Sequence, residues 1–100
     1  MDVTKNLQES RYELHLDGEL AGYLDYVIED GVIDFQHTIV PDAFAGKGIA
    51  SKMLKGALDD VEKEGAYRVK ATCPFVKGYF KKNPDVQYLL AEGIEDEIVD

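Results

Sequence analysis

The chain has 100 residues, enough for one domain with its own core and too few for two. A hydrophobic content of 45% argues against a disordered chain, and a net charge of −9 excludes general nucleic-acid binding, which needs a basic surface. The one cysteine, Cys73, rules out an internal disulfide.

The first half of the chain has the pattern of an antiparallel sheet. Apolar and polar residues alternate, as in strands with one buried face, over 12–16, 20–28 and 32–40. Asp17-Gly18 and Asp30-Gly31 separate these segments and are hairpin signals. Pro41 ends the third strand, because proline lacks a backbone N–H. The sequence therefore predicts a three-stranded meander.

The period then changes to that of a helix. Apolar residues over 49–61 recur on one helical stripe, and Gly65 stands where a helix would end. Alternation over 67–73 predicts a fourth strand, followed by a short helix over 75–82. Strand, helix and strand form a β-α-β unit, in which the two strands are parallel. We therefore expect an α/β (α+β) fold: an antiparallel meander that leads into a β-α-β unit with a parallel strand pair and a short C-terminal helix.

A glycine loop, Gly46-Lys47-Gly48, opens the predicted long helix. A helix start has free N–H groups and a positive dipole end, which attract anions. The loop matches neither a Walker loop, because Pro41 stands at its first glycine, nor a dinucleotide fingerprint, because Ser51 stands at its third. The residues alone leave both an anion cradle and a structural turn open. Parallel strands end at one sheet edge, so we expect Cys73 near this loop.

Two segments together carry a resemblance to a known superfamily. "AFAGKGIASKML" resembles the pyrophosphate loop and following helix of the GNAT N-acetyltransferases. "HTIVP…GKGIA" with "CPFVKGYFKKNPD" is similar to a small single-domain branch, which lacks the usual first strand and helices. The resemblance implies a minimal GNAT-like, acetyl-coenzyme-A-binding domain over 10–90, between an N-terminal extension (1–9) and an acidic C-terminal tail (91–100).

The resemblance also implies an activity. Acetyl-coenzyme A would be the acyl donor, and an amine would be the acceptor, either a protein lysine or N-terminus or a small amine. The acidic charge fits such a cationic partner. The alternative is a non-catalytic coenzyme-A-binding or protein-interaction module that keeps the fold.

Other partners are not expected. Two histidines and one cysteine at unhelpful spacings argue against a metal site. A polar N-terminus and the lack of a long apolar run predict a cytoplasmic protein with no membrane partner. The oligomeric state stays open.

By the resemblance, the coenzyme is held by loop residues, main-chain groups and the last helix. The residues implied are Ile39, Val40, Ala45, Gly46, Lys47, Gly48, Ile49, Ala50, Tyr79 and Asn83. The chain departs from the family pattern twice. Ala43 replaces a Gln or Arg of the loop, and Phe80 aligns with a tyrosine that often protonates the leaving thiolate. Tyr79 is adjacent but points elsewhere on a helix.

Cys73 and His37 are the candidate catalytic residues. Cys73 precedes a helix start, which favours the thiolate. It could therefore be an acyl acceptor, or a proton donor in place of the missing tyrosine. The alternative is a small buried apolar residue, because Cys73 shares the apolar face of its predicted strand. His37 shares the predicted strand face of Ile33, Phe35 and Ile39, near the carboxyl end of the strand. It is therefore either a general base or a core histidine.

Overall fold

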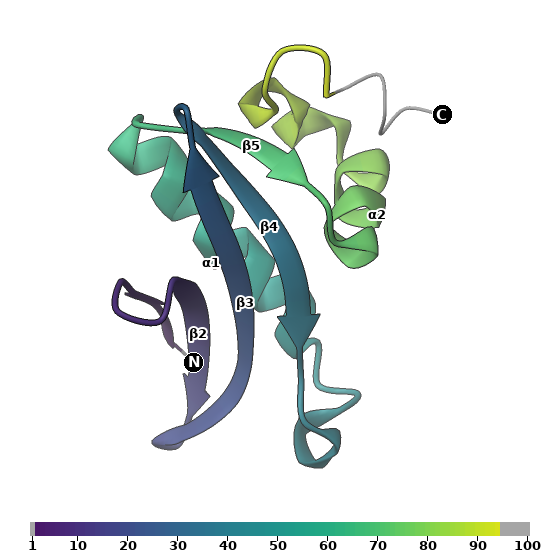
Figure 1. Cartoon of the computed structure of the whole chain (residues 1–100). Helices are drawn as coiled ribbons and strands as arrows, with labels where there is room; N and C mark the ends of the chain where they lie inside the picture. The colour runs from purple at the N-terminus through teal and green to yellow at the C-terminus, as the bar shows by residue number, and fades with distance from the viewer. Residues whose placement is uncertain (1, 95–100) are drawn as a thin grey trace.

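The computed structural model describes residues 2–94, which form a five-stranded sheet in the order β1-β2-β3-β4-β5 (Figure 1). The strands are β1 (Asp2–Asn6), β2 (Arg11–Leu16), β3 (Glu19–Glu29), β4 (Val32–Ile39) and β5 (Arg68–Ala71). The helices are α1 (Ile49–Glu64) and α2 (Pro74–Lys82), with 3₁₀ turns η1 (Asp42–Phe44) and η2 (Pro84–Leu89). None of the helices within residues 2–94 has the length and apolar character needed to span a membrane.

The predicted α/β (α+β) fold is confirmed. Strands β1 to β4 pair antiparallel, and β4 pairs parallel with β5 through α1. Both predicted hairpin turns are left-handed at two consecutive residues, Asp17-Gly18 (φ 52° and 81°) and Asp30-Gly31 (φ 51° and 76°). This conformation matches the twist of the flanking strands, which explains the aspartate-glycine pairs.

The core lies between the sheet and the two helices. The stripe predicted over 49–61 is the buried side of α1: Ile49, Met53, Leu54, Ala57, Leu58 and Val61. Tyr12, 1% exposed, donates its hydroxyl to Asp60 Oδ2 at 2.7 Å, which ties β2 to α1. Burial and this hydrogen bond raise the pKa of Tyr12 far above its usual value.

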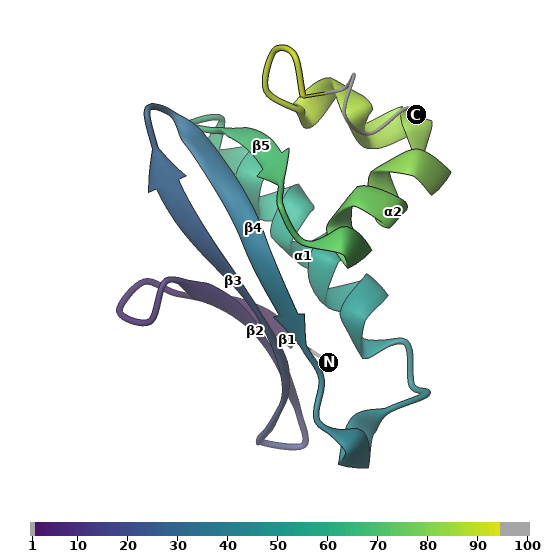
Figure 2. The ribbon, with the colours of Figure 1, turned by 45° about the vertical axis from the view of Figure 1, so that its right-hand side comes forward.

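Both helices lie on the same side of the sheet (Figure 2). The opposite side carries Arg11, Glu13, Tyr23, Asp25 and His37, and we call it the open face because no helix of the described chain covers these residues. On this face Arg11 Nε and Asn6 Nδ2 donate to Glu13 Oε2, at 2.7 and 2.9 Å, which lowers the pKa of that carboxyl. The Arg11 guanidinium also stacks on Tyr23, 4.4 Å from the ring centroid.

One strand was not expected. Residues 2–6, within the predicted N-terminal extension, form β1 at the edge of the sheet and pair antiparallel with β2. Its Lys5 ammonium lies 5.8–5.9 Å from the ring centroids of Tyr12, Tyr26 and Tyr67 and 3.3 Å from Glu64 Oε2. These contacts fix a strand whose sequence has little apolar alternation.

The predicted acidic tail is described in part. Ala91 donates its N–H to the Val69 carbonyl at 2.8 Å, so the chain runs beside β5 after η2. Residues 95–100, most of that tail, lie outside the described residues.

Gly56 of α1 tests how β1 packs. A Cβ built at Gly56 would lie 2.8 Å from Val3 Cβ, so we expect Gly56→Ala to lower the melting temperature, although alanine favours a helix by about 1 kcal/mol. In a Val3→Gly background the same change should be neutral or stabilising. Urea unfolding of the unmodified protein, the two single variants and the double variant measures the coupling free energy between positions 3 and 56. An equal effect in both backgrounds would contradict the packing of β1 on α1.

Candidate functional site

The site begins where β4 and β5 separate. Their parallel pairing runs from Val32 opposite Arg68 to Phe35 opposite Ala71. There the Phe35 carbonyl accepts the N–H groups of both Thr72 and Cys73, at 3.1 and 3.0 Å, and the chain turns into α2. Strand β4 continues to Ile39 without a β5 partner in the described chain. The starts of α1 and of α2, whose N-cap is Cys73, lie toward the same end of the sheet (Figure 1).

A β-bulge in β4 redirects its last residues. Tyr26 pairs with Phe35, but the preceding Asp25 pairs with His37, so Gln36 is an extra residue. Because of this extra residue, the residues of β4 after Gln36 lie on the opposite faces from those that regular alternation predicts.

The predicted face of His37 is therefore wrong. Ile33 and Phe35 are fully buried beneath the sheet, whereas the His37 side chain is 66% exposed and lies on the open face. Ile39, cross-strand from Tyr23, is exposed on the same side as His37. His37 is not a core histidine, and its role as a base stays a prediction.

Two glycines of the loop before α1 adopt a left-handed backbone conformation. Gly46 and Gly48 have φ values of 80° and 72°, and a Cβ at either would meet nothing within 4 Å. Gly48 is the N-cap of α1, no side chain caps the helix, and the first intrahelical bond is Lys52 N–H to Gly48 O at 3.1 Å. The N–H groups of residues 49–51 thus precede the helical ladder. The predicted turn is confirmed, and the space beside it is open to a ligand.

Two hollows meet at this helix start. One of about 220 Å³ is lined by Val40, Phe44, Ala45, Gly46, Gly48, Ile49, Ala50 and Ser51. The other, of about 270 Å³, is lined by Ser51, Pro74, Phe75, Gly78, Tyr79, Lys82 and Asn83. Ser51 borders both, so together they follow the N-terminal end of α1 toward α2. Eight of the ten predicted coenzyme-binding residues line these hollows, and Ile39 and Lys47 do not. Larger hollows around Arg68 and Tyr88 contain none of the ten.

Cys73 is the N-cap of α2 and is 5% exposed. It shares a buried face with Val69 and Ala71, as its apolar pattern predicted. Its Sγ lies 3.3 Å from Thr38 Oγ1, a partner that sequence reasoning missed. Thr38 and Cys73 face the helices, and His37 faces away, so the sheet separates the two candidate catalytic residues.

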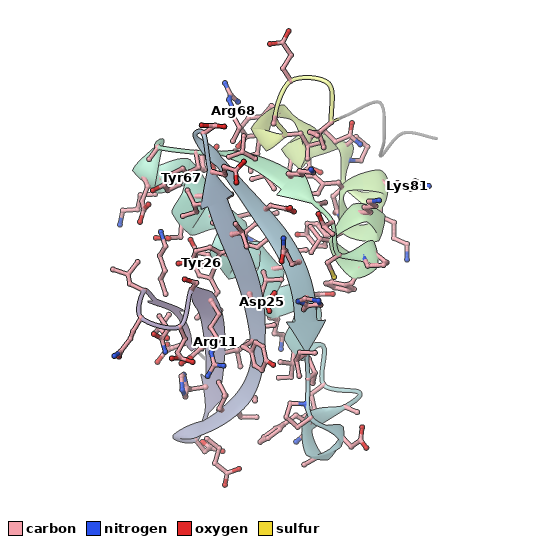
Figure 3. The ribbon with its side chains drawn as sticks, viewed as in Figure 1. Arg11, Asp25, Tyr26, Tyr67, Arg68 and Lys81 are labelled. Carbon is pink, nitrogen blue, oxygen red and sulfur yellow. The ribbon has the colours of Figure 1, made fainter. Side chains whose placement is uncertain are left out.

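Asp25 was also missed, since nothing in its strand pattern marks it. Its carboxylate accepts the backbone N–H of His37 at 2.8 Å and lies 3.0–3.1 Å from His37 Nδ1. Figure 3 shows Asp25 in front of the sheet, away from α1. In the described residues, no group of three His, Cys, Asp or Glu side chains could hold a metal ion.

A family model described as GCN5-related N-acetyltransferase matches residues 11–89. The chain belongs to this family. Protein NATD1 of Gallus gallus is 47% identical over 91 residues, which cover 89% of this chain and 82% of the relative. Protein NATD1 of Mus musculus is 37% identical over 89 residues, with 87% and 80% covered. A solution structure of a GCN5-like protein from Staphylococcus aureus matches 90% of this chain and 87% of its own with a TM-score of 0.67. At 20% identity it shows the fold alone.

Ala43 and Phe80 are the two residues of this GCN5-related chain that depart from the pattern implied by the resemblance. Ala43 lies exposed in η1, with no polar side-chain group to offer a ligand. Phe80 is fully buried and packs in the core. Tyr79 is half-buried and borders the second hollow, and its carbonyl accepts Asn83 Nδ2–H at 2.8 Å.

The burial of Cys73 makes a prediction about thiol reactivity. We expect the folded protein to react with an aromatic disulfide reagent at least about tenfold more slowly than the urea-unfolded chain. Thr38→Ala, which removes the side chain against Sγ, should speed the reaction, whereas the control Thr4→Ala on β1 should not. Release of the coloured thiol gives the rates. Equal rates for folded and unfolded protein would contradict a buried thiol.

Proposed function

We propose that the chain binds acetyl-coenzyme A and transfers its acetyl group to the amine of a cationic acceptor. Family membership supports acetyl transfer as the reaction class. The observation that carries the proposal for this chain is the uncapped start of α1, where two hollows meet. A helix start of this kind binds phosphate groups through backbone N–H groups and the helix dipole.

The residues present fit the coenzyme. N–H groups of residues 49–51 would bind its pyrophosphate, and the glycines beside them leave room for its close approach. The exposed Lys47 adds a positive charge. The second hollow, with Tyr79, Lys82 and Asn83, offers mixed polar and aromatic surface for the long arm. Loss of the loop side-chain donor at Ala43 should weaken this binding.

Acetyl-coenzyme A, when bound, supplies an activated acetyl thioester. In the transfer one C–N bond forms, one C–S bond breaks, and an ammonium acceptor loses two protons. His37, exposed on the open face, would take one of them as a general base. The Cys73 thiol would give its proton to the departing coenzyme sulfur and would regain the second proton of the amine. As an acyl acceptor, Cys73 would instead carry the acetyl group covalently, which intact-mass analysis distinguishes.

The acceptor is an amine that is cationic in solution. A chain with net charge −9 attracts such molecules and repels anionic ones. Both a protein lysine or N-terminus and a small polyamine satisfy this condition.

A second function has specific support. With Ala43 in place of a donor and Phe80 buried in place of an acid, two family groups are missing. A module that binds coenzyme A without turnover would need neither. The two functions share the binding step and differ only in turnover.

Binding is tested by thermal unfolding with acetyl-coenzyme A. At a hundredfold excess over its dissociation constant, the ligand should stabilise the fold by about 2.7 kcal/mol, which is roughly 4–8 °C for each kcal/mol in a domain of this size. Gly48→Val should abolish the shift because the side chain enters the space beside the N–H groups. The control Gly18→Val, at a similar open left-handed position (φ 81°), carries a similar strain and should keep the shift. No shift for the unmodified chain at millimolar ligand would reject the coenzyme site.

Turnover is tested by thiol release from acetyl-coenzyme A with polyamines and lysine peptides. We expect release that depends on the amine and falls by about 10²-fold or more in Cys73→Ala. Melting curves with coenzyme A control for folding and binding. An unchanged rate in Cys73→Ala would remove Cys73 from the mechanism. Ligand binding with no amine-dependent release would favour the non-catalytic module.

A further inference from the structure

Asp25 and His37 form a hydrogen-bonded pair at the bulge of β4. We propose that Asp25 is a positioning residue for acetyl transfer, which holds the His37 ring so that its Nε2 can accept a proton from the amine. This inference rests on the proposed function and deepens it, because it adds a residue and defines the side from which the amine arrives.

The chemistry of the pair fixes the position of the ring proton. The Asp25 carboxylate only accepts hydrogen bonds, and both of its oxygens lie within 3.1 Å of His37 Nδ1. In neutral His37, Nδ1 therefore carries the hydrogen and Nε2 keeps its lone pair. With the side chain 66% exposed, Nε2 is open to solvent on the open face.

The bulge gives Asp25 a second role. The extra residue, Gln36, displaces His37 in the register, and Asp25 Oδ1 accepts the His37 backbone N–H at 2.8 Å. Backbone and ring of His37 are thus held by one carboxylate. Among residues 2–94, His37 is the only residue that hydrogen-bonds to the Asp25 carboxylate.

The other histidine provides a contrast within the same chain. His15 Nε2 lies 3.6 Å from Glu13 Oε1, beyond good hydrogen-bond distance, and Glu13 already accepts from Arg11 and Asn6. His15 is thus not held by the Glu13 carboxylate as His37 is held by Asp25. The Asp25–His37 pair differs in its two anchors on one residue and in its place beside Thr38, which touches Cys73.

The pair assigns the two sides of β4 different tasks. Cys73 and Thr38 face the helices, while His37 lies on the open face. The amine would approach from the open face, give one proton from its ammonium form to Nε2, and use the freed lone pair to form the C–N bond. The imidazolium then returns that proton to solvent.

Asp25→Asn separates the two roles of the carboxylate. The amide oxygen can still accept the His37 backbone N–H, while the amide N–H₂ donates to Nδ1. The neutral ring should therefore move its hydrogen to Nε2, which can no longer act as a base. Asp34→Asn is the matched control, because the Asp34 carboxylate on neighbouring β4 accepts hydrogen bonds from Thr72 and Gln36 and none from the His37 ring.

The first measurement needs no activity. Nitrogen chemical shifts of the His37 ring, recorded where the imidazole is neutral, should show an unprotonated Nε2 in the unmodified protein and in Asp34→Asn. In Asp25→Asn they should show a protonated Nε2. A protonated Nε2 in the unmodified protein, or no change in Asp25→Asn, would overturn the proposal.

The second measurement is kinetic. In Asp25→Asn we expect kcat to fall by about 10²-fold or more, with the KM for acetyl-coenzyme A and the thermal shift unchanged, and no such loss in Asp34→Asn. Full turnover in Asp25→Asn despite the moved ring proton would reject the positioning role while leaving acetyl transfer intact. Absence of turnover in the unmodified protein would instead reject acetyl transfer, and the positioning role with it.

Discussion

The carbonyl oxygen of Phe35 accepts hydrogen bonds from two consecutive backbone N–H groups, those of Thr72 and Cys73, and the parallel ladder ends there. A longer ladder would pair the last residues of β4 and leave no gap between the strands. Because β5 turns away into α2, residues 36–39 keep an edge free between the starts of α1 and α2. Both candidate catalytic residues depend on that free length of β4, because His37 belongs to it and Cys73 contacts its Thr38.

The bulge divides this free length between two faces. Without Gln36 as an extra residue, His37 would lie under the sheet with Phe35, where an imidazole would need a buried partner. With it, His37 meets Asp25 on the open face, and the next residue, Thr38, is turned toward Cys73. One inserted residue therefore places the side chains of His37 and Thr38 on opposite faces of the same strand.

Periodicity predicted the parts of the fold that are fixed by burial. The strands on either side of the two aspartate-glycine turns and the stripe of α1 each bury one face, and that leaves a repeat in the sequence. Strand β1 leaves almost no apolar repeat in the sequence, because it is short and is held by the contacts of Lys5 with three tyrosine rings. The bulge at Gln36 leaves none either, since a polar residue fits an alternating strand in any register. Asp25 and Thr38 could not be identified, because both depend on that register.

The start of α1 lacks a side-chain cap. A serine or aspartate at the N-cap would satisfy one free N–H with its side chain and would stabilise the helix over glycine by about a few tenths of a kcal/mol. Gly48 supplies no side chain and adopts a left-handed conformation, whereas an N-cap residue is usually extended. A turn alone would need neither the missing cap nor a second left-handed glycine two residues earlier, at Gly46. A ligand with phosphate oxygens would satisfy the same N–H groups and needs the open space that both glycines leave. The uncapped start of α1 therefore has the open backbone geometry that the proposed coenzyme site would use.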